Sequence, residues 1–188
     1  AEALAVSEGG LDVLVAALDD DAAGVRVSAL DGLGRLRDAV TAPRVSTLLQ
    51  TDADASVRRA AARALGSLGP IGAAALARAL GADLDEQVRA EAALQLGSLG
   101  GSEAEAALVG ALSDRSTRVR QASLGALERA GWKPDGAMAE ALIAAAREDW
   151  RGLGRIGAPA VPILARVVRE TGDDPVSLSR RVGASEGL

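Results

Sequence analysis

The fold is decided by a stretch that reads DLDEQVRAEAALQLGSLG over residues 83–100. Its apolar residues fall on one helix face, because Val88, Ala92 and Leu96 follow one another at intervals of four residues. Gly100 stands where helices commonly end, since glycine adopts the left-handed conformation that closes the last turn. The stretch therefore predicts one amphipathic helix with a defined end.

The same frame occurs three more times, over residues 20–36, 52–69 and 114–131. In each copy an aspartate stands five residues before a valine, an arginine follows the valine directly, and a leucine stands eight residues after it. Such repetition indicates a tandem array. We expect each aspartate to accept backbone N–H bonds at the turn ahead of the helix. The columns are Asp20, Asp52, Asp83 and Asp114; Val25, Val57, Val88 and Val119; Arg26, Arg58, Arg89 and Arg120; Leu33, Leu65, Leu96 and Leu127.

A shorter apolar segment precedes each copy, so each period is predicted to be a hairpin of two helices. One hairpin cannot bury its apolar stripe alone, whereas stacked hairpins can. We therefore expect an all-α, right-handed α-solenoid, with Ala29, Ala61 and Ala92 placed where neighbouring helices approach closely. The apolar residues of the first helices are Leu11, Leu14 and Leu18; Val45, Leu48 and Leu49; Leu76 and Leu80; Leu108 and Leu112.

The pattern D-x-x-x-x-V-R-x-x-A-x-x-x-L-G resembles the short HEAT-like repeats of prokaryotic proteins, which belong to the armadillo-like helical class. The resemblance covers about residues 11–171. It implies a superhelix of stacked hairpins, and the same class of repeat occurs in the phycobilisome-lyase group. It implies little about activity, because such repeats serve many unrelated roles.

The chain is predicted to form a single solenoid domain over residues 1–188, with clear repeats over about 11–131, degenerate repeats over about 132–176 and a polar tail over 177–188. The fifth unit is shortened. Neither end shows the polar cap typical of a solenoid, so we expect the array to belong to a longer protein. Further half-repeats are predicted at residues 1–6, 158–170 and 172–176.

The composition excludes whole classes of catalytic site. The chain has no His and no Cys, so its own residues cannot form a Ser-His-Asp triad, a thiol nucleophile or a zinc–thiolate site. Asp52-x-Asp54-x-Ser56 begins like an EF-hand loop, but Val57 replaces the required glycine and Arg63 the required glutamate. We therefore expect a non-catalytic protein with no cofactor and no metal site.

Charge and hydropathy argue against several kinds of partner. The net charge is −5 and there is no Phe or Tyr, so a nucleic acid would meet neither a broad basic surface nor the usual stacking rings. The longest uncharged run, residues 64–77, is interrupted by Gly and Pro and is too short to span a bilayer. We see no targeting segment and no titratable cluster suited to a small molecule. We expect a cytoplasmic protein whose partner is another protein or a peptide.

The aspartate and arginine columns allow two interpretations. They could form four acid–base pairs. The alternative is a structural ladder of ion pairs and loop hydrogen bonds that sets the register of the repeats. We favour the ladder, because a catalytic pair has no reason to recur in every period.

The exposed positions of the second helices are the candidate binding surface, since solenoids usually bind along one such face. Their mixture of charged, polar and apolar residues suits a protein partner. The frame places these residues on the face: Val27, Ser28, Asp31 and Arg35; Arg59, Ala60, Arg63 and Ser67; Ala90, Glu91, Leu94 and Ser98; Gln121, Ala122, Gly125 and Arg129. The candidate partner-binding residues are Arg59, Arg63, Leu94, Gln121, Arg129, Arg151, Arg155 and Trp132.

If the fifth unit keeps the frame, Arg151 and Arg155 join Arg59 and Arg63 as two small basic spots, able to bind carboxylates or phosphates by bidentate hydrogen bonds. The tryptophans, Trp132 and Trp150, could be interface anchors, although we favour packing against the shortened unit.

The function favoured by these observations is a non-catalytic scaffold that binds a protein or peptide. The resemblance supplies one alternative, a phycobilisome-lyase-like protein that assists bilin attachment, with Arg59 and Arg63 as partners of the propionates. A third possibility is a regulatory repeat module of a larger enzyme.

Overall fold

The computed structural model describes residues 10–163 and residue 165, and this part of the chain is helical with no strand. The four copies of the frame each form a helix, which we call the second helices. They are α2 (Ala23–Leu36), α4 (Ala55–Leu68), α6 (Glu86–Leu99) and α8 (Thr117–Arg129). The predicted glycines stand at their ends, since Gly69 and Gly100 follow α4 and α6 directly and Gly131 lies two residues beyond α8.

Each second helix is preceded by a shorter first helix, as the spacing predicts. Residues 10–16 are helical and continue into a 3-10 turn, η1 (Ala17–Asp19). The next two begin with a 3-10 turn, η2 (Ala39–Thr41) before α3 (Ala42–Thr51) and η3 (Pro70–Gly72) before α5 (Ala73–Ala82). The fourth is α7 (Ser102–Ala111).

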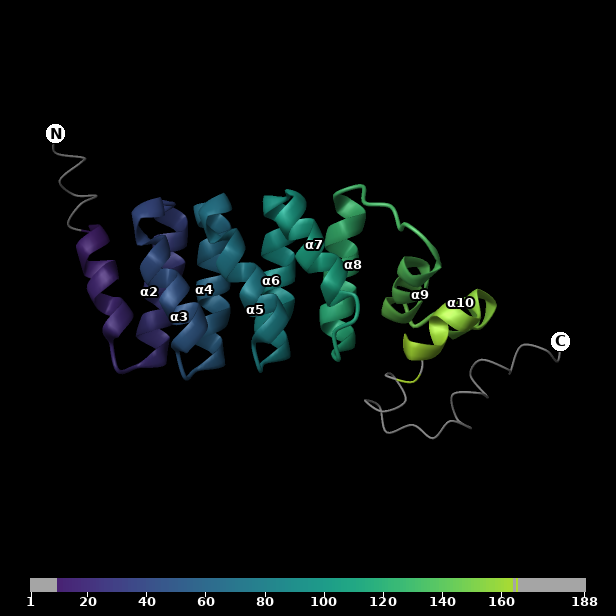
Figure 1. Ribbon diagram of the computed structural model, residues 1–188. Coiled ribbons are helices and arrows are strands. Elements are labelled where there is room, and N and C mark those ends of the chain that lie inside the picture. The colour runs from purple at the N-terminus through teal and green to yellow at the C-terminus, as the bar shows by residue number, and fades with distance from the viewer. Residues whose placement is uncertain (1–9, 164, 166–188) are drawn as a thin grey trace.

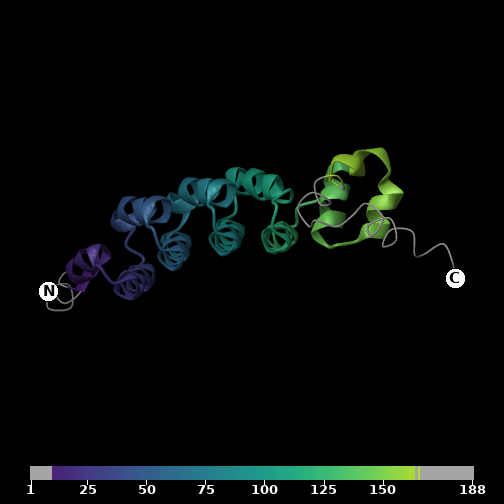
Figure 2. The ribbon, with the colours of Figure 1, turned by 90° about the horizontal axis from the view of Figure 1, so that it is seen from below.

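The hairpins stack in chain order. The second helices pack α2 on α4, α4 on α6 and α6 on α8, while α3, α5 and α7 pack on one another in a parallel row. Figure 2 shows the two rows, with the first helices in one layer and the second helices in the other. The expected all-α solenoid of stacked hairpins is confirmed.

The leucine and valine columns build the core between the rows. Leu33, Leu65, Leu96 and Leu127 are fully buried, as are the last three valines of the column. Val25 departs from the prediction, because 41% of its surface is exposed. The structure describes no second helix before α2, so nothing in the row covers this valine as the preceding repeat covers the others.

A column of glycines lets the second helices approach one another closely. These glycines, Gly34, Gly66 and Gly97, directly follow the leucines of the repeated frame. A Cβ atom at Gly34 would lie 3.3 Å from the Cα of Ala64, and one at Gly97 would lie 2.5 Å from the Cβ of Ala126. A side chain at this column would therefore collide with the next second helix.

The regular stack ends at α8, where the glycine column holds Glu128 instead. The fifth unit consists of α9 (Ala137–Ala146), α10 (Trp150–Ile156) and the turn η4 (Ala158–Ala160). Figure 1 shows α10 turned away from the direction of α8, after a long connection from α8 to α9. α10 packs on α9 and η4, around a small core of its own that includes Leu153 and Ile163.

Other predictions for the chain ends lie outside the described residues. These are the half-repeat at residues 1–6, most of the first helix predicted at 158–170, the helix start at 172–176 and the polar tail at 177–188.

Candidate protein-binding face

The aspartate and arginine columns are joined between repeats. The Nε atoms of Arg26, Arg58 and Arg89 donate to the carboxylate of the aspartate in the following repeat at 2.8–2.9 Å, and their Nη2 atoms donate to the second oxygen at 2.9–3.0 Å. Each pair is therefore bidentate, and both side chains are largely buried. The acceptors are Asp52, Asp83 and Asp114 in turn.

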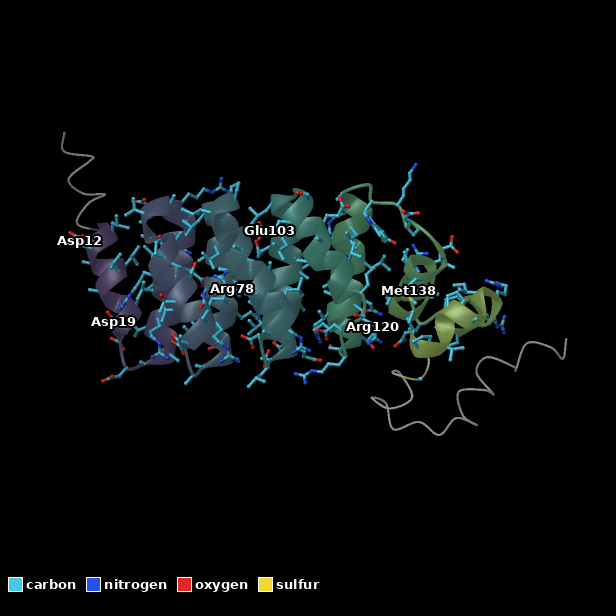
Figure 3. The ribbon with its side chains drawn as sticks, viewed as in Figure 1. Asp12, Asp19, Arg78, Glu103, Arg120 and Met138 are labelled. Carbon is cyan, nitrogen blue, oxygen red and sulfur yellow. The ribbon has the colours of Figure 1, made fainter. Side chains whose placement is uncertain are left out.

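Each arginine of the column also holds the turn within its own repeat. The Nη1 atom of every arginine in the column donates to the backbone oxygen of the aspartate six residues earlier, at 2.7–3.0 Å. Each aspartate carboxylate accepts the backbone N–H two residues later, at 2.7–2.9 Å. The column aspartates are not the N-caps of the second helices. Asp54 and Asp85, two residues later, accept the backbone N–H bonds at the starts of α4 and α6. Figure 3 labels Arg120 on α8, the last second helix of the row.

The first three arginines of the ladder keep their protons at neutral pH. The hydrogen bonds to Asp52, Asp83 and Asp114 raise the pKa of Arg26, Arg58 and Arg89 above its ordinary value, although burial acts in the opposite direction. A guanidinium with such a pKa remains charged and cannot serve as a base. The geometry thus supports the structural interpretation of these columns.

A second network crosses the outer face of the second helices. Arg63 on α4 donates to Asp31 on α2 at 3.1 Å and lies 4.0 Å from Glu91 on α6. Arg59 donates to Gln87 at 2.7 Å and lies 3.8 Å from Glu91. These side chains link three consecutive second helices, so Arg59 and Arg63 belong to a charge-balanced network rather than to one of the two small basic spots considered from the sequence.

Two of the predicted face positions are wrong. Ala60 is fully buried and Ala90 is 7% exposed, because these alanines lie against the neighbouring helices. The frame locates residues around one helix but does not say how widely each helix is covered by the next. Other predicted face positions are exposed and carry larger side chains than these alanines. They include Leu94, which is 42% exposed, Gln121 and Arg129.

The fifth unit does not extend this face. Arg151 and Arg155 are exposed on α10, which packs on α9 instead of joining the row of second helices. Trp132 is half-buried against the main core, and Trp150 is half-buried against the small core of the fifth unit. Both tryptophans pack as we favoured. A groove of about 580 Å³ lies between α9 and α10 and includes Arg155.

Two searches of the described residues bear on other kinds of site. Among residues 10–163 and 165, no three acidic side chains gather in a way that could hold a metal ion. In the same part of the chain, none of the helices has the length and apolar character needed to cross a membrane.

Two segments of the chain, residues 11–83 and 73–158, match the family of HEAT repeats. The chain belongs to the HEAT-repeat family. Together the two matches cover the hairpin stack and the fifth unit, so the resemblance inferred from the Asp, Val, Arg and Leu columns is confirmed. HEAT-repeat domains are generally protein-interaction scaffolds and are typically non-catalytic. No curated protein matches this chain.

Proposed function

We propose that this HEAT-repeat domain is a non-catalytic scaffold that binds a protein or peptide along the outer face of α2, α4, α6 and α8. Four helices in a row present an extended surface, as large protein partners require. The first helices pack on the other side of the core.

The observation that carries this proposal is Leu94. It is a large apolar side chain, 42% exposed, on α6 in the interior of the row. Exposed polar side chains also lie on the second helices, with Ser98 one turn beyond Leu94 on α6, Arg59 on α4 and Gln121 on α8. An apolar centre with a polar rim is the usual anatomy of a protein-binding patch.

The bilin alternative receives no comparable support. Arg59 and Arg63 were the expected partners of the propionates, and both are engaged by Gln87, Glu91 and Asp31. A tetrapyrrole acid would have to break these bonds before it could use the guanidinium groups.

Affinity capture from a cell extract, using the full chain and its Leu94→Arg variant, tests the proposal. The matched control is Leu84→Arg, which makes the same change in the same repeat at a leucine that is 85% exposed in the turn before α6. We expect the main partner to be retained by the wild type and by the control and lost by Leu94→Arg. Equal retention by all three proteins, with unchanged circular dichroism, would remove this face as the binding surface.

A further inference from the structure

A cleft of about 420 Å³ opens between α2 and α4 on the side of the second helices. Three of its lining residues are arginines, Arg35 and Arg37 from the end of α2 and Arg63 from α4. Asp31 and Ser67 also line it. We call this the arginine cleft.

The arginine cleft carries positive charge that the described part of the chain does not balance. Arg63 donates to Asp31 at 3.1 Å, so these two charges offset each other. Arg35 and Arg37 are exposed, and within residues 10–163 and 165 no carboxylate lies within ion-pair distance of either guanidinium. Two cations therefore remain at one cleft of a chain whose net charge is −5.

The backbone at Arg37 supplies an independent observation. Arg37 ends α2 with φ 55° and ψ 31°, which is the left-handed conformation. The equivalent residues of the next three repeats are Gly69, Gly100 and Gly131, each with positive φ. Glycine adopts a positive φ without a steric penalty, whereas arginine does not. A strained residue kept in place of the repeat's own glycine, beside a charged cleft, points to a function for its side chain.

We propose that the arginine cleft binds a carboxylate of an acidic peptide, and so forms the part of the scaffold that recognises its partner. This rests on the proposed function and specifies the chemistry of the partner. A guanidinium binds a carboxylate through two parallel N–H bonds. The chain itself uses this pairing three times, at 2.8–3.0 Å, between its repeats.

A peptide fits the site better than a nucleic acid. The uncompensated charge is confined to Arg35 and Arg37 at one cleft, so a run of phosphates would find no continuous basic track. Ser67 offers a hydroxyl that can donate to or accept from a peptide backbone. One acidic side chain with polar backbone on either side satisfies these groups.

The test is fluorescence anisotropy of a labelled oligo-glutamate peptide of about four residues, which spans roughly 14 Å when extended, added to the full chain. An oligo-glutamine peptide of equal length is the control ligand. The variants are Arg35→Ser and Arg37→Gly, and the control variant is Arg78→Ala, on α5 in the row of first helices and labelled in Figure 3. We expect each cleft variant to weaken glutamate binding by about tenfold, because each removes a charge-assisted pair, and Arg78→Ala to leave it unchanged.

Arg37→Gly separates binding from folding. It restores the glycine of the other repeats, so the melting temperature should rise while affinity for the glutamate peptide falls. If Arg37→Gly leaves the affinity for the glutamate peptide unchanged, whatever the melting temperature does, Arg37 takes no part in binding and the proposal is overturned. Failure of the wild type to bind the peptide would also overturn it. So would an oligonucleotide that competes equally well and is equally sensitive to both variants.

The outcome is distinguishable from that of the scaffold proposal. If the peptide fails to bind but Leu94→Arg still loses its partner, the scaffold proposal is supported and the proposal for the arginine cleft is rejected. If Leu94→Arg retains its partner, the scaffold face falls whatever the peptide does.

Discussion

At the scale of single residues, the arginine and aspartate columns form the same ion pair between each repeat and the next. Each arginine bonds forward to the next repeat through its Nε and Nη2 atoms and back to its own turn through Nη1. One side chain therefore sets both the turn and the spacing to the following hairpin. A lysine could not make these three contacts, because it lacks the planar fork of donors.

We expect Arg89→Ala to lower the free energy of unfolding by roughly 2–4 kcal/mol. Breaking a buried pair leaves the partner charge unsatisfied, and here Asp114 keeps some access to water, which reduces the penalty. Urea denaturation followed by circular dichroism measures the change. A double-mutant cycle with Asp114→Ala isolates the pairwise part, and a coupling energy near zero would contradict the ladder interpretation.

Arg37→Gly is expected to raise the free energy of unfolding by about 1 kcal/mol, because a left-handed residue with a side chain carries a penalty that glycine lacks. Thermal melting measures the effect. The matched control is Gly69→Arg, which places arginine at the equivalent position of the next repeat, where φ is 90°, and should destabilise. A stability loss for Arg37→Gly would show that the arginine side chain supports the fold.

The cap at the start of α4 predicts a pH dependence. The hydroxyl of Ser56, followed by its backbone N–H, bonds the carboxylate of Asp54 and lowers its pKa below the ordinary value. A lowered pKa in the folded state means that the stabilisation is present at neutral pH and is lost as the pH falls through the folded-state pKa. The stability difference between the wild type and Asp54→Ala should therefore shrink toward zero in acid.

Asp54→Asn provides the control for this prediction, because asparagine also caps helices but does not titrate in this range. Urea unfolding at a series of pH values from neutral to acid compares the three proteins. If the wild type and Asp54→Asn change in parallel with pH, the Asp54 carboxylate is not the titrating group.

At the scale of the helices, the glycine column decides how closely the repeats stack. We expect Gly97→Ala to lower the free energy of unfolding by about 1–3 kcal/mol, because the new Cβ would overlap the Cβ of Ala126 on α8. Gly81→Ala is the control, since a Cβ there meets nothing within 4 Å and alanine favours the helix. Equal effects of the two substitutions in urea denaturation would contradict close packing at this column.

The helices themselves were predictable because their signals are local. Val88, Leu96 and Gly100 describe one helix and its end without reference to any other repeat. Contacts between repeats are not local, and this is where prediction was incomplete. Ala60 and Ala90 are covered by neighbouring helices, and the partners of Arg63 come from two other repeats. The recurring Leu-Gly pair was visible in the motif, but its role requires the distance to the next helix.

The candidate face was predictable only as a set of exposed positions. Leu94, Gln121 and Arg129 lie exposed on second helices as the frame indicates, and their part in binding stays a prediction. The strain at Arg37 could be suspected from an arginine at a column otherwise filled by glycine. Its backbone angle and its place in a cleft required the three-dimensional arrangement of α2 and α4.

At the scale of the whole molecule, the described chain has two parts with different packing. The hairpins through α8 share one continuous core that also includes Ala146 of α9, whereas α10 packs on the other side of α9 around a second, small core. Glu128 stands in the glycine column at the boundary and is bonded to Arg147 beyond α9. A charged side chain at this column prevents the next helix from approaching α8 as α8 approaches α6, so the row of second helices ends there.

This division predicts unequal local stability. In a linear array each hairpin is stabilised by its neighbours, so α4 and α6, with a repeat on each side, should open only with global unfolding. α10 has seven residues, and in the described part of the chain its main packing partners are α9 and η4. Hydrogen exchange followed by mass spectrometry should show amides of α9 and α10 exchanging at least about tenfold faster than those of α4 and α6, which corresponds to about 1.4 kcal/mol of opening free energy. Equal protection of α6 and α10 would mean that the fifth unit is coupled to the stack as firmly as any regular repeat, despite Glu128.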